Sequence, residues 1–212
     1  MTNPEFSYEF DILYNNIMSN QAPGLDEYEK SVFLTKALEE ITVSLYTGKY
    51  PLYEGFESTE EIRRYLNSLY ETYIYNNSNL NSNSSSLEVN LPPSVLFIVY
   101  ESAIVDNKEL MVVPTTYDEY HRVKRNPFRQ ANSRRVLRLE KSGIIILDSI
   151  VPINSYKMVY LRKPQPIILT NLSEGLTIND SNKETPCELP EALHRTILER
   201  AVQLAKISMK NS

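Results

Sequence analysis

The chain has 212 residues, a length that suits one domain or a core domain with one elaboration. Its residues are 42% hydrophobic and 23% charged, which is close to the average of globular proteins, and its formal net charge is −5. Gly is scarce, with 5 residues, and neither GxGxxG nor GxxxxGK[ST] occurs, which excludes the glycine-rich loops that cradle phosphates. The single cysteine, Cys187, excludes an intrachain disulfide framework.

Charge and hydropathy also bear on location and partners. The opening MTNPEFSYEFD lacks the basic-then-apolar order of a secretion signal, and the longest nearly apolar run, near 95–100, is far shorter than a bilayer span. We therefore expect a soluble protein made and kept in a reducing cytoplasm. Residues 1–75 hold 13 acidic and 5 basic groups, whereas residues 76–212 hold 14 and 17, which indicates two faces with different partners.

Three apolar stripes with helical spacing predict three helices in the first third of the chain. The first stripe is Phe6, Phe10, Leu13 and Ile17. The second follows a capping-box pattern at Asp26 and Glu29, ends near Gly48, and consists of Leu34, Leu38, Ile41 and Leu45. The third follows another capping-box pattern, at Ser58 and Glu61, continues to about residue 75, and consists of Ile62, Tyr65, Leu66 and Leu69.

Residues 76–86 read NNSNLNSNSSS, a composition that cannot bury enough apolar surface to offset its ordering entropy, so we expect a flexible surface loop. Beyond it the hydrophobic period changes from helical to alternating. Five or six short strands, mostly antiparallel, are expected, with a short helix from Tyr117 to about Lys124. The strands fall at 87–91, 95–105, 109–115, 134–139, 144–147 and 156–162.

The chain closes with a helix that starts near Pro190 and carries an apolar stripe at Leu193, Ile197, Ala201 and Leu204. The expected fold class is α+β: a helical bundle built from both chain ends, with an inserted small antiparallel β-domain. The expected division is 1–75 and 188–212 for the bundle, 76–86 for the loop and 87–187 for the β-domain.

The strongest charge feature lies at 122–141, where eight of the 22 basic residues fall and only Glu140 opposes them. Three interpretations stay open: contact with an acidic protein surface, contact with phosphates, or a solvated hairpin face with no specific partner. The acidic net charge favours the protein partner, because nucleic-acid modules are usually basic overall. The candidate protein-interface residues are Arg122, Lys124, Arg125, Phe128, Arg129, Arg134, Arg135 and Arg138.

Residue types that carry catalysis or bind metals occur without the neighbours they need. His121 and His194 have no Ser or Cys nucleophile setting, and one His–Cys pair is too little for a zinc site, which requires four ligands. Cys187 has no positive neighbour in sequence to lower its pKa. Adjacent carboxylates in the first third can bind metals in nucleases, but at these spacings they more often begin helices. We expect no enzymatic activity, no metal and no cofactor.

Tyrosines concentrate between residues 46 and 75, where they either line an interface with an identical neighbour or pack at core edges. Both readings stay open for Tyr46, Tyr50, Tyr53, Tyr65, Tyr70, Tyr73 and Tyr75.

An ordered series of segments spanning about Glu5 to Lys206 resembles virion structural proteins of crAss-like and related tailed phages. The segments are EFDILYNNIMSNQAPGLDEYEKSVFLTKALEEI, LPPSVLFIVYESAIV, VVPTTYDEYHRVKRNPF and YLRKPQPIILTNL with the C-terminal CELPEALHRTILERAVQLAK. The resemblance implies a head-to-tail connector component similar to the adaptor or tail-tubular proteins of short-tailed phages. It implies a ring, of twelve copies by analogy with portals, that binds the portal protein or neighbouring ring or tail proteins. Such a ring lets DNA pass without sequence-specific binding and without contact with a membrane.

The resemblance places the protein in the virion, assembled in the host bacterial cytoplasm, and implies no catalytic residues. Charge then indicates a mechanism: acidic walls let DNA slide, whereas a basic lining would bind its phosphates. The candidate acidic wall of the DNA channel is Glu39, Glu40, Glu60 and Glu61. The alternative function is a DNA-binding or packaging accessory protein that uses the basic segment 122–141.

Overall fold

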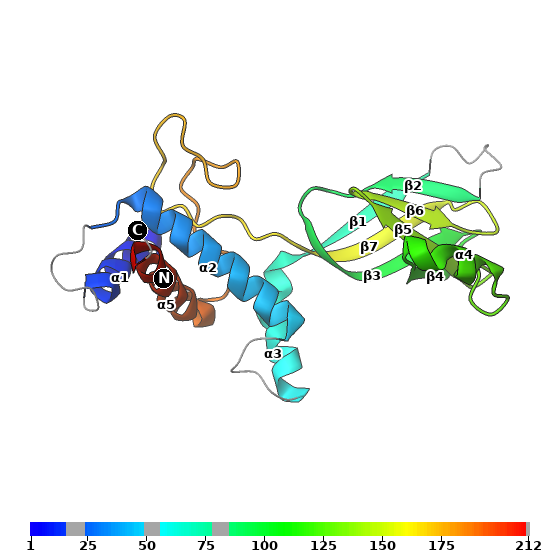
Figure 1. The fold of residues 1–212 in the computed structure, drawn as a ribbon, viewed down its shortest axis with the longest axis horizontal. Coiled ribbons are helices and arrows are strands. Elements are labelled where there is room, and N and C mark those ends of the chain that lie inside the picture. The colour runs from blue at the N-terminus through cyan, green and yellow to red at the C-terminus, as the bar shows by residue number, and fades with distance from the viewer. Residues whose placement is uncertain (16–23, 49–55, 78–84, 211–212) are drawn as a thin grey trace. The chain divides into compact units, whose positions relative to one another are not determined.

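The computed structural model describes residues 1–15, 24–48, 56–77 and 85–210. The backbone forms two compact units: a helical unit of Met1–Leu69 with Pro164–Ser212, and a sheet unit of Tyr70–Lys163 (Figure 1). The α+β class is confirmed. The segment 164–187, expected in the β-domain, belongs to the helical unit, and most of the expected Asn/Ser loop lies outside the described residues.

The helical unit contains α1 (Asn3–Asn15), α2 (Glu27–Thr47), α3 (Phe56–Leu66), the 3-10 turn η1 (Asn67–Leu69) and α5 (Glu191–Lys210). Helix α2 packs along α5, and α1 contacts both of them (Figure 1). The predicted capping box of α2 is confirmed, since the Asp26 side chain accepts from the Glu29 backbone and the Glu29 side chain accepts from the Asp26 backbone. Gly48 ends α2 at a φ of 68°, a conformation that glycine adopts without a steric penalty.

The third predicted helix ends earlier than expected, because α3 stops at Leu66 and Tyr70–Asn76 forms strand β1. The prediction of helix up to residue 75 was therefore wrong. Aromatic and β-branched residues fill this strand, and such residues favour extended backbone where a neighbouring strand is available. The predicted stripe position Ile17 lies outside the described residues. The side chain of Ser58, predicted to cap the third helix, lies outside the described side chains.

Buried polar side chains join α2 to the extended segment that follows the sheet unit. The Thr35 hydroxyl donates to the backbone carbonyl of Ile167 and accepts from its N–H, and the Ser31 hydroxyl accepts from the N–H of Leu169. Because buried backbone groups need partners, these two side chains let an irregular segment lie in the core. The surrounding apolar side chains come from both chain ends: Phe6, Phe10, Leu34, Leu38, Leu45, Leu193, Ile197 and Ala201.

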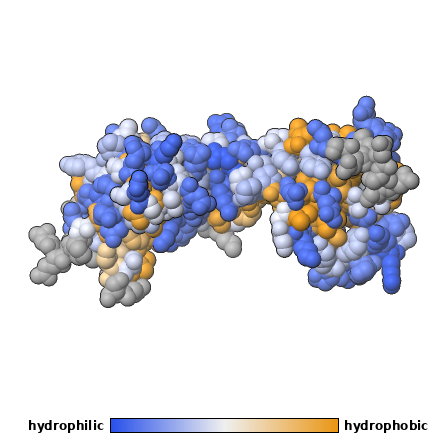
Figure 2. All heavy atoms as spheres, turned by 90° about the horizontal axis from the view of Figure 1, so that it is seen from above, coloured by the Kyte–Doolittle hydropathy of each residue, from blue (hydrophilic) through white to orange (hydrophobic). Residues whose placement is uncertain are grey.

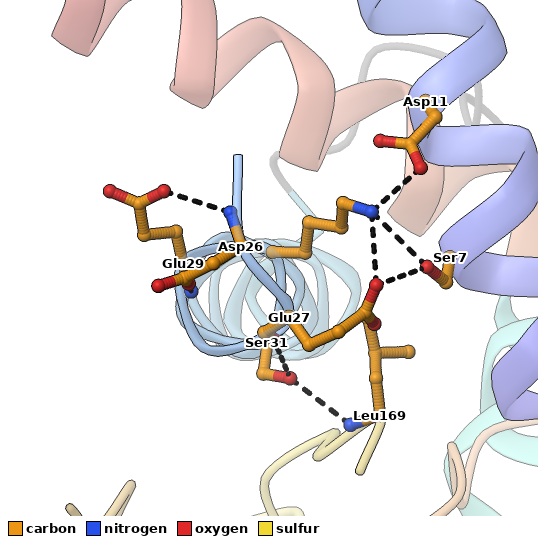
Figure 3. A network of polar contacts seen from close by, with 8 residues as sticks. Ser7, Asp11, Asp26, Glu27, Glu29, Ser31 and Leu169 are labelled. Carbon is orange, nitrogen blue, oxygen red and sulfur yellow. Dashed lines mark hydrogen bonds and ion pairs between the residues drawn. The ribbon is translucent and has the colours of Figure 1, made fainter. Parts of the chain in front are cut away.

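A buried lysine joins α1 to α2. The Lys30 Nζ lies 2.7 Å from Asp11 Oδ2 and 3.2 Å from Ser7 Oγ on α1, and 3.1 Å from Glu27 Oε1 on its own helix (Figure 3). Burial by itself lowers the pKa of Lys30, but the hydrogen bonds and charges of Asp11 and Glu27 outweigh burial, so the pKa is raised. The protonated Lys30 side chain therefore links α1 and α2 through ion pairs and hydrogen bonds.

The sheet unit is a seven-stranded sheet with the order β1-β7-β3-β4-β5-β6-β2. Its strands, with α4 (Tyr117–Arg125) between β4 and β5, are β1 (Tyr70–Asn76), β2 (Ser86–Asn90), β3 (Val95–Val105), β4 (Lys108–Pro114), β5 (Arg135–Lys141), β6 (Ile144–Asp148) and β7 (Ser155–Arg162). The strands predicted from alternation are confirmed as β2 to β7, and the short helix predicted from Tyr117 is confirmed as α4.

The sheet is mixed, because β4 and β5 run parallel while the other neighbours are antiparallel. A parallel pair needs a crossover connection, and α4 supplies it. The expectation of mostly antiparallel strands is therefore confirmed, and β4–β5 is the one parallel pair among the described strands. The sheet curls around a core to which β2 through β7 contribute, including Val89, Ala103, Val112, Val136, Leu147 and Met158.

Candidate interaction surfaces

The basic segment 122–141 is divided between α4, a turn and β5. Helix α4 carries acidic residues in its first turn and Arg122, Lys124 and Arg125 in its last, an order that suits the helix dipole. Buried Val123 and the hydrogen bond from the Tyr120 hydroxyl to Asp148 of β6 attach the helix to the sheet. The basic end of α4 is thus presented on a firmly anchored helix.

Phe128 projects from an ordered turn just after α4. The Asn126 side chain accepts from the Phe128 N–H at 2.9 Å, its carbonyl accepts from the N–H groups of the next two residues after Phe128, and the Arg135 guanidinium donates to the Phe128 carbonyl at 3.0 Å. The ring is nevertheless 87% exposed. Beside it lies a shallow hollow of about 790 Å³, whose lining includes Asp118, His121, Arg122, Arg125, Pro127 and Phe128.

Some of the predicted interface residues have partners within the unit. Arg122 pairs with Glu119 at 2.5 Å, and Lys124 pairs with Asp148 at 3.1 Å. Hydrogen bonds to Tyr120 and Asp148 raise the pKa of Lys124, so its charge persists. The remaining exposed cations of the set are Arg125, Arg129 and Arg134.

Arg138 lies apart from this surface, because its side chain is only 13% exposed. Its guanidinium lies 3.3 Å from Glu101, whose other oxygen accepts a 2.7 Å hydrogen bond from the Tyr156 hydroxyl. Burial raises the pKa of Glu101, and the hydrogen bond from Tyr156 and the charge of Arg138 oppose the rise. These three side chains form a polar group within the sheet unit. The candidate basic surface is therefore restricted to the end of α4 and the turn at Phe128.

The four candidate acidic-wall residues lie on α2 and α3, and each has a local partner. Glu40 forms a two-point ion pair with Arg200 of α5, with its shorter contact at 2.6 Å, and Glu60 pairs with Arg64 at 2.7 Å. Glu39 accepts from the Asn179 amide at 2.7 Å. Glu61 accepts from the Tyr65 hydroxyl. Because the partners of Glu39 and Glu61 are neutral, the negative charges of these two carboxylates are not compensated by the contacts described.

A second apolar surface, which the sequence did not reveal, lies between α1 and α5. A groove of about 450 Å³ is lined by apolar side chains of both helices and rimmed by Glu9, Arg195 and Glu199. Tyr8 on this groove is 70% exposed. The apolar lining is Tyr8, Ile12, Leu13 and Leu198. No signal in either helix alone predicts the groove, because it exists only where the two ends of the chain pack together.

Other apolar residues are exposed on the sheet unit, where Figure 2 shows hydrophobic atoms at the surface. The most exposed of them after Phe128 are Met111, Ile150 and Ile74. Tyr73 and Tyr75 of the tyrosine cluster pack against the sheet core, which supports the core-edge interpretation for these two. Tyr50 and Tyr53 lie outside the described residues.

The residue types that suggest catalysis are engaged in packing. His194 is buried against the Phe6 ring, and its two nitrogens bond the N-terminal amine of Met1 and the Leu189 carbonyl, each at 2.8 Å. Burial raises the pKa of the Cys187 thiol to about 11. Across the described ranges, no group of three or more His, Cys, Asp or Glu side chains is placed to bind a metal ion. Within the same ranges, every helix is too short or too polar to cross a membrane.

An anchored basic turn with an exposed aromatic ring, and an apolar groove bordered by charged side chains, are features typical of proteins that assemble with other proteins. Comparison with known proteins agrees. The family model described as phage tail ring protein 3/4 matches residues 1–212. Ring protein 3 of Bacteroides phage crAss001 is 44% identical over 221 residues, covering 98% of this chain and 96% of that protein. Ring protein 4/5 of the same phage is 36% identical over 216 residues, covering 95% and 91%.

The chain therefore belongs to the phage tail ring protein 3/4 family. The resemblance to virion structural proteins of crAss-like phages is confirmed, and the protein is a structural ring protein and a virion component. Membership of this family supports a structural role over an enzymatic one.

Proposed function

We propose that this protein forms a closed homo-oligomeric ring of twelve copies in the connector between portal and tail, through which DNA passes without sequence-specific contacts. The observation that carries the proposal is the family match over residues 1–212, together with relatives named as ring proteins that align over nearly their whole length. The copy number rests on the analogy with portals.

The charges on the helical unit support the channel part of this proposal. Acidic groups repel the DNA backbone, so a wall of Glu39, Glu40, Glu60 and Glu61 lets DNA slide. The ion pairs of Glu40 and Glu60 leave Glu39 and Glu61 as the main contributors to the repulsion.

The basic end of α4 and its turn are proposed to dock on an acidic protein surface, either of the portal or of a neighbouring ring. A DNA-binding role for the same surface is the second candidate, because Arg125, Arg129 and Arg134 are exposed. Glu119 and Asp148 neutralise Arg122 and Lys124, which weakens the case for phosphate binding.

Electron microscopy and native mass spectrometry of the purified chain test the ring. Rings of uniform size are expected, with a mass twelve times that of the protomer. A chain that stays monomeric up to high concentration and is missing from phage particles would contradict the proposal. A DNA shift assay separates the two roles of the basic surface: weak binding is expected, and tight binding that falls steeply with salt would favour the accessory role.

A further inference from the structure

Two exposed aromatic rings stand out from the rest of the surface. Among the large hydrophobic side chains in the described parts of the chain, Phe128 and Tyr8 are the most exposed. Phe128 is held by the hydrogen-bonded turn at Asn126, and Tyr8 lies on helix α1 at the α1/α5 groove. Rigid aromatic side chains exposed in this way are typical of the anchors that dominate protein interfaces.

The two rings lie in surroundings of opposite charge. Phe128 borders a hollow lined by Arg122, Arg125 and the single carboxylate of Asp118. Arg122 pairs with Glu119 beside the hollow, so the exposed Arg125 is the cation that this surface offers to a partner. The groove at Tyr8 has two carboxylates against one guanidinium, Arg195. Helix α1, which forms one wall of this groove, carries three acidic residues and no lysine or arginine. One surface offers a ring with a basic rim, and the other offers an apolar groove with an acidic rim.

We propose that Phe128 of one copy inserts into the α1/α5 groove of a second copy and packs there against Tyr8. In the same contact, Arg125 lies near Glu9 and Glu199 of the groove rim. This inference rests on the proposed ring and names the contact that builds it. The occupant is a second copy, because both complementary surfaces belong to the same chain.

Such a contact leads to a ring rather than a dimer. The two surfaces are different and lie in different units, so each added copy leaves one turn and one groove unoccupied. Contacts of this head-to-tail kind close into a ring when the rotation between neighbouring copies permits it and otherwise extend as a filament, whereas a patch that binds itself ends at two copies. The groove combines α1 with α5, so it is complete in every folded copy.

Truncation of the aromatic anchor is the first test. Phe128→Ala is expected to weaken self-association about 30-fold, as for an interface hot spot, in sedimentation-velocity titrations of the full chain. The fold should be unaffected, because the ring is 87% exposed. Tyr117→Ala is the matched control, since Tyr117 is a half-exposed aromatic at the start of α4, the helix that precedes the Phe128 turn, and lies outside the hollow. An unchanged affinity for Phe128→Ala overturns the inference.

Charge reversal then tests the pairing of the two surfaces. Arg125→Glu and Glu9→Lys are each expected to weaken association roughly fivefold, and the combined variant should recover most of the loss. Lys108→Glu, an exposed residue outside both surfaces, should change little. Additive losses without recovery would show that the two residues do not face each other.

Cross-linking identifies the occupant. One tagged chain carries Ile12→Cys in the groove lining and another carries Pro127→Cys beside Phe128, both with Cys187→Ser, so that both aromatic rings remain. Mild oxidation of the mixture should join the two tags. Rings that form normally without this cross-link overturn the inference and leave the proposed function intact. A wild-type chain that never associates with itself overturns both the proposed ring and the proposed contact. A groove that cross-links only to another virion protein belongs to that protein's interface, and this result overturns the inference.

Discussion

The buried lysine between α1 and α2 gives a prediction whose size follows from exposure. The Lys30 side chain is 4% exposed, whereas its partners Asp11 and Glu27 are 47% and 39% exposed. Removing the amine leaves two carboxylates that water still reaches, but removing both carboxylates leaves a buried ammonium. The double variant Asp11→Asn with Glu27→Gln should therefore destabilise the fold more than Lys30→Met does.

The magnitudes follow from the same geometry. Lys30→Met loses hydrogen bonds to charged groups, worth about 1.5–3 kcal/mol, but it relieves the desolvation of the amine, so we expect a loss of about 1–2 kcal/mol. The double variant should lose about 3–5 kcal/mol, the usual result of leaving a buried charge without its partner. The cost of burying the charge has an upper limit, because the amine can instead lose its proton. At pH 7, about 3.4 pH units below the ordinary lysine pKa of about 10.4, deprotonation costs roughly 4.6 kcal/mol at about 1.36 kcal/mol per unit.

The pH dependence should change sign between the two proteins. In the wild type the pKa of Lys30 is raised on folding, so its stabilisation is complete below the unfolded value and is lost as the pH rises above it. In the double variant burial acts without the carboxylates and lowers the pKa. The folded state then binds fewer protons than the unfolded state, and stability should increase with pH up to the unfolded value.

Urea denaturation followed by circular dichroism at 222 nm measures these losses, because most of the helix lies in the helical unit. Lys36→Met is the matched control: Lys36 is an exposed lysine on the same helix, and its replacement should change stability by less than about 0.5 kcal/mol. A greater loss for Lys30→Met than for the double variant would refute the assignment of Lys30 as a buried charge.

Three further predictions concern single residues. Burial and the nearby N-terminal amine lower the pKa of His194, while its hydrogen bond to the Leu189 carbonyl opposes this shift. The stability of the fold should therefore decrease as the pH drops below about 6.5, the ordinary pKa of histidine. His194→Gln should remove this decrease in a pH series of thermal melts. Gly143 has a φ of 78° in the β5–β6 turn, so Gly143→Val should cost about 1–2 kcal/mol in urea melts, while an unchanged midpoint would contradict the strained turn. Cys187 has a pKa of about 11, so at pH 8 the fraction of reactive thiolate is roughly 100-fold lower in the native protein than in the unfolded chain. Its reaction with a thiol reagent should be slower by the same factor in native protein than in urea, and equal rates would refute its burial.

Much of the sheet could be predicted from the sequence, because alternation records which face of each strand is buried. The stretch Val95–Val105 and the turn after it illustrate this: β3 and β4 form where predicted, joined at Asp106 and Asn107 with φ of 47° and 60°. Asn and Asp tolerate this conformation better than other non-glycine residues. Local patterns succeed here because the turn and both strands are specified by adjacent residues.

The failures lie where distant parts of the chain decide the outcome. Tyr70–Asn76 continues the apolar stripe of α3, and its pairing with β7, from Tyr70 opposite Leu161 to Asn76 opposite Ser155, makes it a strand instead. The parallel pair β4–β5 is by contrast a local feature, since the helix between these two consecutive strands permits a crossover. The segment 164–187 has no period, and its place beside α2 depends on the side chains of Ser31 and Thr35.

The candidate surfaces show the same division. Charge counting located the basic segment, but it could not separate Arg125, which is exposed, from Arg138, which lies inside the sheet unit beside Glu101. It also could not show that Glu40 is neutralised by Arg200, a residue 160 positions away. A charge becomes a functional candidate only when its partners are known, and those partners come from other elements.

The way in which the sheet unit joins the helical unit leads to a final prediction. The chain enters the sheet through β1 and leaves it through β7, and these neighbours are paired from Tyr70 opposite Leu161 onward. Both connections therefore lie at one end of a single ladder, and among the described residues the buried core of the curled sheet consists of side chains from Tyr70–Lys163.

An excised fragment of Tyr70–Lys163 should consequently fold without the helices, since its core and its strand pairing are complete. We expect a strand-type circular dichroism spectrum, dispersed amide resonances and one cooperative melt with a heat-capacity change of about 1.1–1.4 kcal/mol/K. Replacing the buried Val136 with Asp in the fragment is the control that should abolish the melt. A fragment with broadened resonances and no cooperative melt would mean that the helical unit supplies stabilisation that the sheet core lacks, and the sheet would then not be an autonomous insertion.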